Sequence, residues 1–455
     1  MPSKEKISNG VLYPGAPDSL DAADYAARPS WPEDRPAQRP FPKNFLYLFF
    51  LSMGLLFILL AFLFNTLWEI LTGSLVILTS PANLLTDYFQ LANIGATLMN
   101  AGLMLLLSIS VLRWRRIEIS GSIIAAIFTV AGFSFFGKNL YNTLPIMLGV
   151  FLYSKAIRQP FEKYILHALF GTALCPLVSE LSFNLGLPPP LGILLGIGTG
   201  MAAGFMVAPL SVHFIKFHQG CSLYNIGFTA GIIGMIIMAV LRGFGVEIDT
   251  VNILSSGNNA GFSAILYGLF AVLFLCGLYA NHWRIRGFGR LLSQTGVLGT
   301  DFVPVSGLGV TLMNMALLGM LSTGYVLALD GELNGPVIGG IFTVVGFGAY
   351  GKHIKNVVPV LLGVFLVNLF NIHAGNASVA LMAALFGTTL APVAGRYGFA
   401  AGVFAGMLHM SLVSNISFLH AGMNLYNNGF AGGFIAAALC PLFDAMMEIK
   451  KAWKN

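Results

Sequence analysis

The sequence predicts an all-α integral membrane protein, and three observations support this prediction. Of the 455 residues, 56% are hydrophobic and 9% are charged, whereas soluble domains carry about 25% charged residues. Apolar runs long enough to cross a bilayer recur throughout the chain after residue 43. The second half of the chain also repeats motifs of the first half. Because so little charge cannot solvate a globular surface, the expected environment is the lipid bilayer.

The first 43 residues differ from the rest of the chain. They are rich in Pro, Ala, Asp and Arg, and they contain no apolar run. The lack of an apolar run argues against a cleaved signal peptide. We predict that residues 1–43 form a mostly disordered cytoplasmic tail.

About 14 membrane-spanning segments follow this tail, since a spanning helix needs roughly 17–25 apolar residues. Segments 141–156 and 356–370 are short, and whether they cross the membrane completely is left open. Segment 67–86 is apolar but contains Glu69, so we place it on the membrane surface. The predicted spans are 44–66, 89–112, 121–137, 141–156, 163–185, 190–215, 224–241, 261–281, 305–328, 335–351, 356–370, 376–394, 398–418 and 428–446.

The distribution of positive charge sets the predicted orientation. If the N-terminus is cytoplasmic and the spans alternate, 22 of the 24 Lys and Arg residues face the cytoplasm. The two exceptions are Lys138 and Arg242. Such a bias is typical of cytoplasmic loops. It predicts a multi-pass protein of the cell membrane with both termini cytoplasmic, and it accounts for the net charge of +6 without nucleic acid.

An internal repeat divides the chain into two halves. Residues 127–152 and 341–366 are identical at 15 of 26 positions, at an offset of 214. Each half contains seven predicted spans, and because seven is odd, the second half must enter the membrane from the opposite side. We therefore predict two inverted seven-span repeats, an arrangement typical of transporters. The predicted units are the tail 1–43, repeat 1 over 44–243, repeat 2 over 261–446 and a cytoplasmic tail over 447–455.

The motif H-x-G-x-[SN]-L-Y-N-x-G-F occurs in each half, at residues 218–228 and 420–430. Its glycines interrupt one apolar run before another begins, so we expect a turn between two helices, with Ser222 and Asn424 as N-caps. The free N–H groups of such a helix start attract anions and polar solutes. We predict a solute site between the halves; the alternative is a tight turn that the fold needs twice. The predicted binding residues are Ser222, Tyr224, Asn225, Asn424, Tyr426 and Asn427.

Two further paired motifs place polar residues in or beside apolar spans. The first, Gly-x-Thr-Leu-Met-Asn, contains Thr97, Asn100, Thr311 and Asn314. These side chains must find partners in lipid, so they either join helices or bind the solute. The second, Gly-Lys-x-x-x-Asn-x-x-Pro, contains Lys138 and Lys352. We place both lysines at membrane edges and expect Lys352 to reach the headgroups.

Acidic residues within membrane spans are rare and usually functional. Glu180 lies near the outer end of a predicted span, and its partner in the second half is Arg396. Asp87 and Asp301 stand at the mouths of two further spans. We predict Glu180, Asp87 and Asp301 as candidates for coupling to an ion or a proton; for Glu180 the alternative is an interfacial residue in water.

No enzyme is predicted. The sequence contains none of the motifs HExxH, GxSxG or GxxxxGK[ST]. The four cysteines form no CxxC pair and lack the spacing of metal ligands. We therefore expect no catalytic residues, no cofactor and no metal, and we interpret the cysteines as small apolar residues.

The tandem motifs GKxxxNxxPxxLGVFL and HxGxxLYNxGF resemble those of a bacterial membrane-protein family known as a domain of unknown function present in two copies. The resemblance covers residues 44–446 and implies no substrate. In architecture alone, seven-plus-seven inverted repeats are similar to nucleobase and anion transporters, and more faintly to urea transporters.

The sequence thus favours a secondary transporter for a small polar or anionic solute bound between the inverted repeats. A passive channel and a non-transporting membrane scaffold or sensor are the alternatives. Fold-level similarity alone does not choose among them. The sequence leaves the substrate, the coupling ion and assembly into homo-oligomers open.

Overall fold

A computed structural model describes residues 44–248, 252–370, 375 and 377–453. The predicted disordered tail, residues 1–43, lies outside the described residues. Within them, the regular structure is helical, accompanied by three isolated β-bridges. The all-α prediction is confirmed.

Ten helical segments among the described residues are long and apolar enough to cross a membrane. Each of them overlaps one of the predicted spans. They are α2 (Phe45–Phe64), α5 (Ile94–Trp114), α8–α9 with their flanking 3-10 turns (Phe161–Phe183), α10 (Pro189–Phe217), α11 (Asn225–Gly243), α12 (Asn259–Ala280), α15 (Leu308–Ala328), α18–α19 (Ser378–Tyr397), α20 with the following 3-10 turn (Phe399–His420) and α21 (Asn427–Ala452).

The other four predicted spans correspond to shorter helices. These are α6 (Gly121–Phe133), α7 (Leu140–Ala156), α16 (Gly335–Phe347) and α17 (Ile354–Asn368). A helix of 13 residues, such as α6 or α16, is about 20 Å long, and the hydrocarbon core of a bilayer is about 30 Å thick. Both α6 and α16 are therefore too short to cross the membrane unaided.

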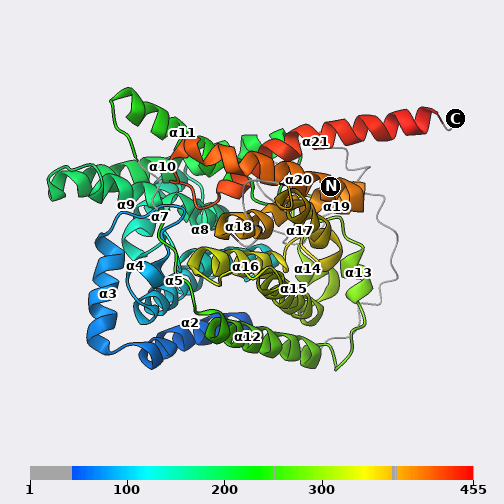
Figure 1. The fold of residues 1–455 in the computed structure, drawn as a ribbon, viewed down its shortest axis with the longest axis horizontal. Helices are drawn as coiled ribbons and strands as arrows, with labels where there is room; N and C mark the ends of the chain where they lie inside the picture. The colour runs from blue at the N-terminus through cyan, green and yellow to red at the C-terminus, as the bar shows by residue number, and fades with distance from the viewer. Residues whose placement is uncertain (1–43, 249–251, 371–374, 376, 454–455) are drawn as a thin grey trace, which may run out of the picture.

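The apolar segment that carries Glu69 forms α3 (Leu67–Thr79). Its first turn is closed by a capping box between Thr66 and Glu69, so the carboxylate serves the helix start. Leu67 and Trp68 are exposed, and α3 stands at a steep angle to α2 (Figure 1). The position of α3 on the membrane surface stays a prediction.

The two short helices α6 and α16 pack against each other, and α16 lies near the centre of the molecule (Figure 1). Every residue of both helices is buried. They approach closely at Gly132 and Gly339, where a β-carbon on Gly132 would lie 2.8 Å from the Gly339 carbonyl oxygen. Longer helices pack in matching pairs around them: α2 on α5 and α12 on α15, α7 on α10 and α17 on α20, and α11 on α21.

The short connecting helices α4 (Tyr88–Leu91), α13 (Phe288–Leu292) and α14 (Phe302–Ser306) complete the fold. Helix α8 (Ile165–Gly171) meets α9 (Cys175–Phe183) at a 3-10 turn over Thr172–Leu174. Helix α18 (Ser378–Gly387) likewise meets α19 (Ala391–Tyr397) at Thr388–Leu390. The first half therefore has two helix breaks, one between α6 and α7 and one between α8 and α9. The second half has the equivalent breaks between α16 and α17 and between α18 and α19.

Candidate functional site

The two Leu-Tyr-Asn turns meet at the interface between the halves. Tyr224 precedes α11 and Tyr426 precedes α21, and their ring centroids are 4.8 Å apart. Two glycines allow this approach. A β-carbon at Gly227 would lie 2.7 Å from Cβ of Tyr426, and one at Gly429 would lie 2.9 Å from Cβ of Tyr224. The glycines of each motif thus receive the tyrosine of the other half.

Phenylalanines from both halves enclose the two tyrosines. Tyr426 lies 4.7 Å from the ring of Phe133, and Tyr224 lies 4.8 Å from that of Phe347. Phe133 in turn contacts Phe386, while Phe347 contacts Phe170. We call this group the central aromatic cluster: Phe133, Phe170, Tyr224, Phe347, Phe386 and Tyr426. The turns therefore meet across packed rings.

The expectation that Ser222 and Asn424 are N-caps is wrong. Neither α11 nor α21 has a side-chain cap, and each begins at the Asn of its motif. The hydroxyl of Ser222 pairs with that of Thr389 at 3.1 Å. Asn424 donates to the Gly227 carbonyl oxygen and accepts from the backbone N–H of Tyr426. Since both side chains reach groups of the opposite half, they join the halves instead of closing a helix start.

The motif asparagines bind the histidines of their own motifs. Nε2 of His218 lies 3.0 Å from Oδ1 of Asn225, and Nε2 of His420 lies 3.0 Å from Oδ1 of Asn427. Asn225 also donates to the Ser211 carbonyl oxygen. The recurring His and Asn therefore hold the turn in shape, which agrees with the structural alternative for these residues.

Asn100 and Asn314 hold the breaks that follow α6 and α16. Nδ2 of Asn100 donates to the carbonyl oxygens of Ser134 and Lys138, at 2.8 and 2.9 Å. Asn314 makes the same pair of bonds to Gly348 and Lys352, at 2.7 and 2.8 Å. These carbonyl oxygens lie at helix ends, where no backbone N–H of the next turn is available to them. Each asparagine amide supplies the hydrogen bonds that those N–H groups would have donated.

The motif threonines have a simpler role. Thr97 donates to the Asn93 carbonyl oxygen and Thr311 to that of Gly307, one turn earlier in α5 and α15. Both are buried. The contacts of Thr97 and Thr311 therefore lie within their own helices.

Lys138 and Lys352 are buried, contrary to our expectation of residues at membrane edges. Lys138 is 1% exposed and Lys352 is 0% exposed, so Lys352 does not reach the headgroups. Nζ of Lys138 donates to Thr172 at 2.6 Å. Nζ of Lys352 donates to Thr388 at 2.6 Å and to the hydroxyl of Tyr224 at 2.5 Å. The charge pattern misplaced them because the breaks after α6 and α16 lie inside the protein.

These lysines are the functional candidates that sequence reasoning underrated. Their signal was present in the repeat, because Gly-Lys-x-x-x-Asn is identical in both halves. A lysine that only reaches headgroups needs no fixed neighbour, yet each of these lysines binds the threonine of a 3-10 turn in its own half. Repetition of the lysine together with its threonine partner was the available clue.

Asp87 and Asp301 each connect the two halves. Asp301 caps α14 through the N–H of Val303, and its second oxygen accepts from Gly121 at the start of α6. Asp87 caps α4 through the N–H of Phe89, accepts from both the N–H and the hydroxyl of Ser255, and accepts from the N–H of Gly335 at the start of α16 in the second half. A carboxylate at a helix N-terminus is stabilised by the helix dipole. Asp301 and Asp87 therefore have a structural role: each carboxylate holds the start of a short helix and a second segment of the chain together.

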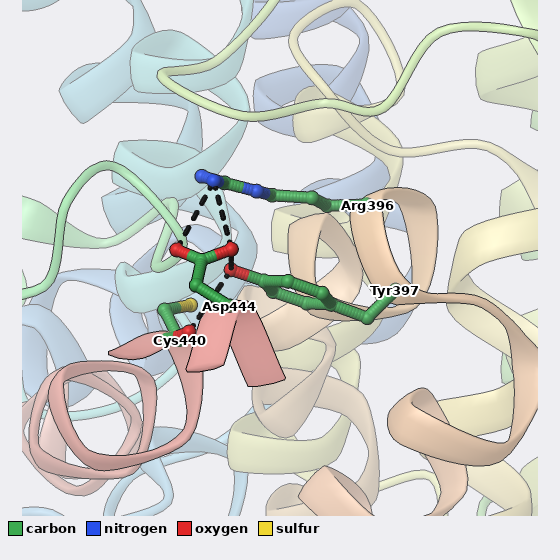
Figure 2. A network of polar contacts seen from close by, with 4 residues as sticks. All are labelled: Arg396, Tyr397, Cys440 and Asp444. Atoms are coloured by element: carbon green, nitrogen blue, oxygen red, sulfur yellow. Dashed lines mark hydrogen bonds and ion pairs between the residues drawn. The ribbon is translucent and has the colours of Figure 1, made fainter. Parts of the chain in front are cut away.

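The pairing of Glu180 with Arg396 in the repeat marks a departure from symmetry. Glu180 is buried, and Oε2 accepts from Asn184 at 2.7 Å, while Oε1 has no hydrogen-bond partner. Arg396 binds both carboxylate oxygens of Asp444 on α21, at 3.0 and 3.1 Å. Figure 2 shows this pair with the Tyr397 hydroxyl, which donates to Asp444 and to the Cys440 carbonyl oxygen.

The first half carries opposite charges at the two positions equivalent to this ion pair. At the offset of 202 that links the two Leu-Tyr-Asn motifs, Asp444 corresponds to Arg242. The first half thus carries Glu180 and Arg242 where the second carries Arg396 and Asp444. Among the described residues the ion pairs are Arg396–Asp444 and Arg115–Glu162, so Glu180 and Arg242 are not joined. Arg242 instead donates to the Phe418 carbonyl oxygen.

Comparison with known proteins now assigns the chain to a family. The profile of the family described as protein of unknown function DUF1576 matches residues 66–243 and again residues 280–445. The chain belongs to this family. No curated protein and no solved structure matches it.

The two DUF1576 matches coincide with the two halves that the internal repeat defines. This confirms the predicted resemblance to a tandem domain of unknown function. Both Leu-Tyr-Asn turns, both buried lysines and the Asp87–Asp301 pair fall within the matched residues. The DUF1576 description names no activity, so the function must be argued from these sites.

Proposed function

We propose that this protein transports a small polar or anionic solute across the cell membrane, through a site between two inverted halves. The observation that carries the proposal is the meeting of the two Leu-Tyr-Asn turns. The charge pattern predicts one turn on the cytoplasmic side and the other outside, yet Tyr224 and Tyr426 are in contact and buried. Two interrupted helices that meet inside the membrane are the usual setting of a transporter substrate site.

The contacts between the halves support this architecture. Asp301 of the second half caps the start of α6 in the first half, and Ser222 of the first half binds Thr389 of the second. Neither half is complete without the other. In this proposal, the predicted residues of the Leu-Tyr-Asn turns line the path, and Glu180 is the candidate for ion or proton coupling because it is buried with one oxygen free.

The inverted orientation predicts opposite labelling of two equivalent loops. Arg116 and Asp330 are 214 positions apart, both are exposed, and both have left-handed φ angles, 53° and 52°. We expect a cysteine at position 116 to react with a membrane-impermeant maleimide only from the cytoplasm, and one at position 330 only from outside. The background is a variant lacking Cys175, Cys221, Cys276 and Cys440. Labelling of both from one side contradicts the inverted repeat.

Transport itself is tested in proteoliposomes. We expect saturable flux of at least one solute from a panel of small anions, amino acids and polyols, and none with protein-free vesicles. Tyr426→Phe should lower this flux about tenfold, the effect of losing one hydrogen bond near the path. The ring packing is retained, so folding should be unchanged. Tyr267→Phe, an exposed tyrosine on α12, is the matched control and should transport normally.

The same experiment separates the alternatives. Flux that does not saturate and ignores pH and sodium gradients indicates a passive channel. No flux of any solute in the panel, with folded protein in the vesicles, contradicts transport. A membrane scaffold is then the better interpretation, consistent with the dense packing of the central aromatic cluster.

A further inference from the structure

Two buried ammonium groups without a carboxylate partner flank the central aromatic cluster. Lys138 follows α6 and Lys352 follows α16, at equivalent positions of the two halves. The two ion pairs among the described residues involve neither lysine, so no carboxylate of those residues lies within 4.0 Å of either ammonium. A lysine at the centre of a membrane helix costs about 2.5–3.5 kcal/mol even on the mildest scale. Because two such lysines are buried, we expect other groups to stabilise their charges.

The protein supplies only part of that compensation. An ammonium has three donors. Lys138 uses one of them on Thr172, and Lys352 uses two, on Thr388 and Tyr224. Aromatic faces add cation–π attraction: Lys138 lies 5.2 Å from the ring of Phe133, and Lys352 lies 4.6 Å from that of Tyr224. Hydroxyls and rings are neutral, so the net positive charge remains.

The surroundings favour recognition of a small anion. Each lysine stands at a break in a helix, where the chain is held from the side by an asparagine amide. Each threonine partner lies on a 3-10 turn, and its hydroxyl already donates to a backbone carbonyl oxygen of the preceding helix, Leu169 in α8 or Leu385 in α18. The threonine therefore accepts from the lysine and has no proton to offer a ligand. The remaining donors belong to the ammonium, and they select an acceptor with negative charge.

We propose that Lys138 and Lys352 are anion-binding residues, one in each half, and that the transported solute is a small inorganic or carboxylate anion. This inference rests on the proposed transport function and narrows its substrate class. In the present conformation the Tyr224 hydroxyl occupies a donor of Lys352 that the anion would take. Tyr426, the equivalent residue, donates to Thr129. The two lysines therefore differ in the number of N–H donors available to an anion, and Lys138 has more of them.

Thermal unfolding in detergent tests the proposal without knowledge of the natural solute. The probes are the sodium salts of chloride, nitrate, formate, acetate and phosphate, each compared with gluconate at equal ionic strength. An anion present at about 100 times its Kd should raise Tm by about 3 °C in a protein of this size. We expect such a rise with at least one probe in the wild type and in Lys163→Gln, an exposed control. It should be lost in Lys138→Gln/Lys352→Gln.

Tyr224→Phe keeps the test valid if the double variant does not fold. It preserves the aromatic packing but removes the hydroxyl that competes for Lys352. The anion concentration at half-maximal shift should fall about fivefold, the equivalent of one net hydrogen bond. An unchanged midpoint in Tyr224→Phe overturns the proposal, as does an undiminished shift in a folded double variant or the lack of a shift with every probe.

These experiments distinguish a failure of the anion-binding proposal from a failure of the transport proposal. Saturable flux of neutral polyols or amino acids, without any anion shift, leaves transport intact and overturns anion recognition. An anion shift that depends on both lysines, with no flux of any solute, supports the binding site and contradicts transport.

Discussion

Replacing Asn100 by leucine is expected to destabilise the protein by about 2–6 kcal/mol. The Asn100 amide donates to two buried carbonyl oxygens, of Ser134 and Lys138, in the break after α6. Leucine has a similar volume but no donor, so both carbonyls lose their partner. Each unsatisfied buried group costs about 1–3 kcal/mol, and in the membrane interior no bulk water is available to replace the amide.

The measurement is the unfolding midpoint in detergent, together with the yield of monodisperse protein. Asn314→Leu should have a similar effect, because Asn314 makes the equivalent bonds. Asn415→Leu is the matched control: its amide donates to one carbonyl oxygen on an exposed face of α20. An Asn100→Leu variant as stable as Asn415→Leu would show that the break does not need the amide.

Replacing Gly204 by alanine is expected to prevent close packing of α10 on α7, at a cost of about 3 kcal/mol. A β-carbon at Gly204 would overlap the carbonyl oxygen of Ile146, and one at Gly149 would overlap that of Met201. Because the obstacle is backbone, it cannot rotate away. Small residues at such crossings allow membrane helices to approach.

Gly198 provides the control on the same helix. It is exposed, and a β-carbon there would meet nothing within 4 Å. Gly198→Ala should be neutral or slightly stabilising, since alanine favours a helix by up to about 1 kcal/mol over glycine. The yield of folded protein and its Tm should therefore fall for Gly204→Ala only. Equal losses for both variants would indicate a general intolerance of α10, and equal stability would mean that the helices separate without cost.

Sequence patterns located most of the fold. Apolar runs identified the ten long apolar helical segments of the described residues and the four shorter helices α6, α7, α16 and α17, because a helix in lipid must be apolar along its length. They did not distinguish spanning helices from the central pair α6 and α16, which are apolar because protein surrounds them on every side. Burial in protein and exposure to lipid select the same residue types. Only the helix lengths in the structure distinguish a helix buried in protein from one that spans the lipid, because α6 and α16 have 13 residues each.

The candidate site was predicted in part. The repeated Leu-Tyr-Asn turns were expected between the halves, and Tyr224 does contact Tyr426. The partners of Ser222 and Asn424 were not predicted, because both bind groups of the opposite half. Contacts between residues 167 and 197 positions apart leave no periodic pattern in a single sequence. The lysines were misplaced for a related reason, since charge patterns assume that a break between spans reaches water.

The sequence by itself determined that this is a membrane protein of two homologous halves. The apolar composition determines that the chain lies in a membrane, and the repeated motifs can be recognised without knowing how the chain folds. Only the tertiary structure decided that Lys138 and Lys352 are buried beside an aromatic cluster, and that Asp301 closes a helix of the other half. Such contacts depend on which segments face each other across the interface. That choice follows from packing two whole halves together, and no local stretch of sequence encodes it.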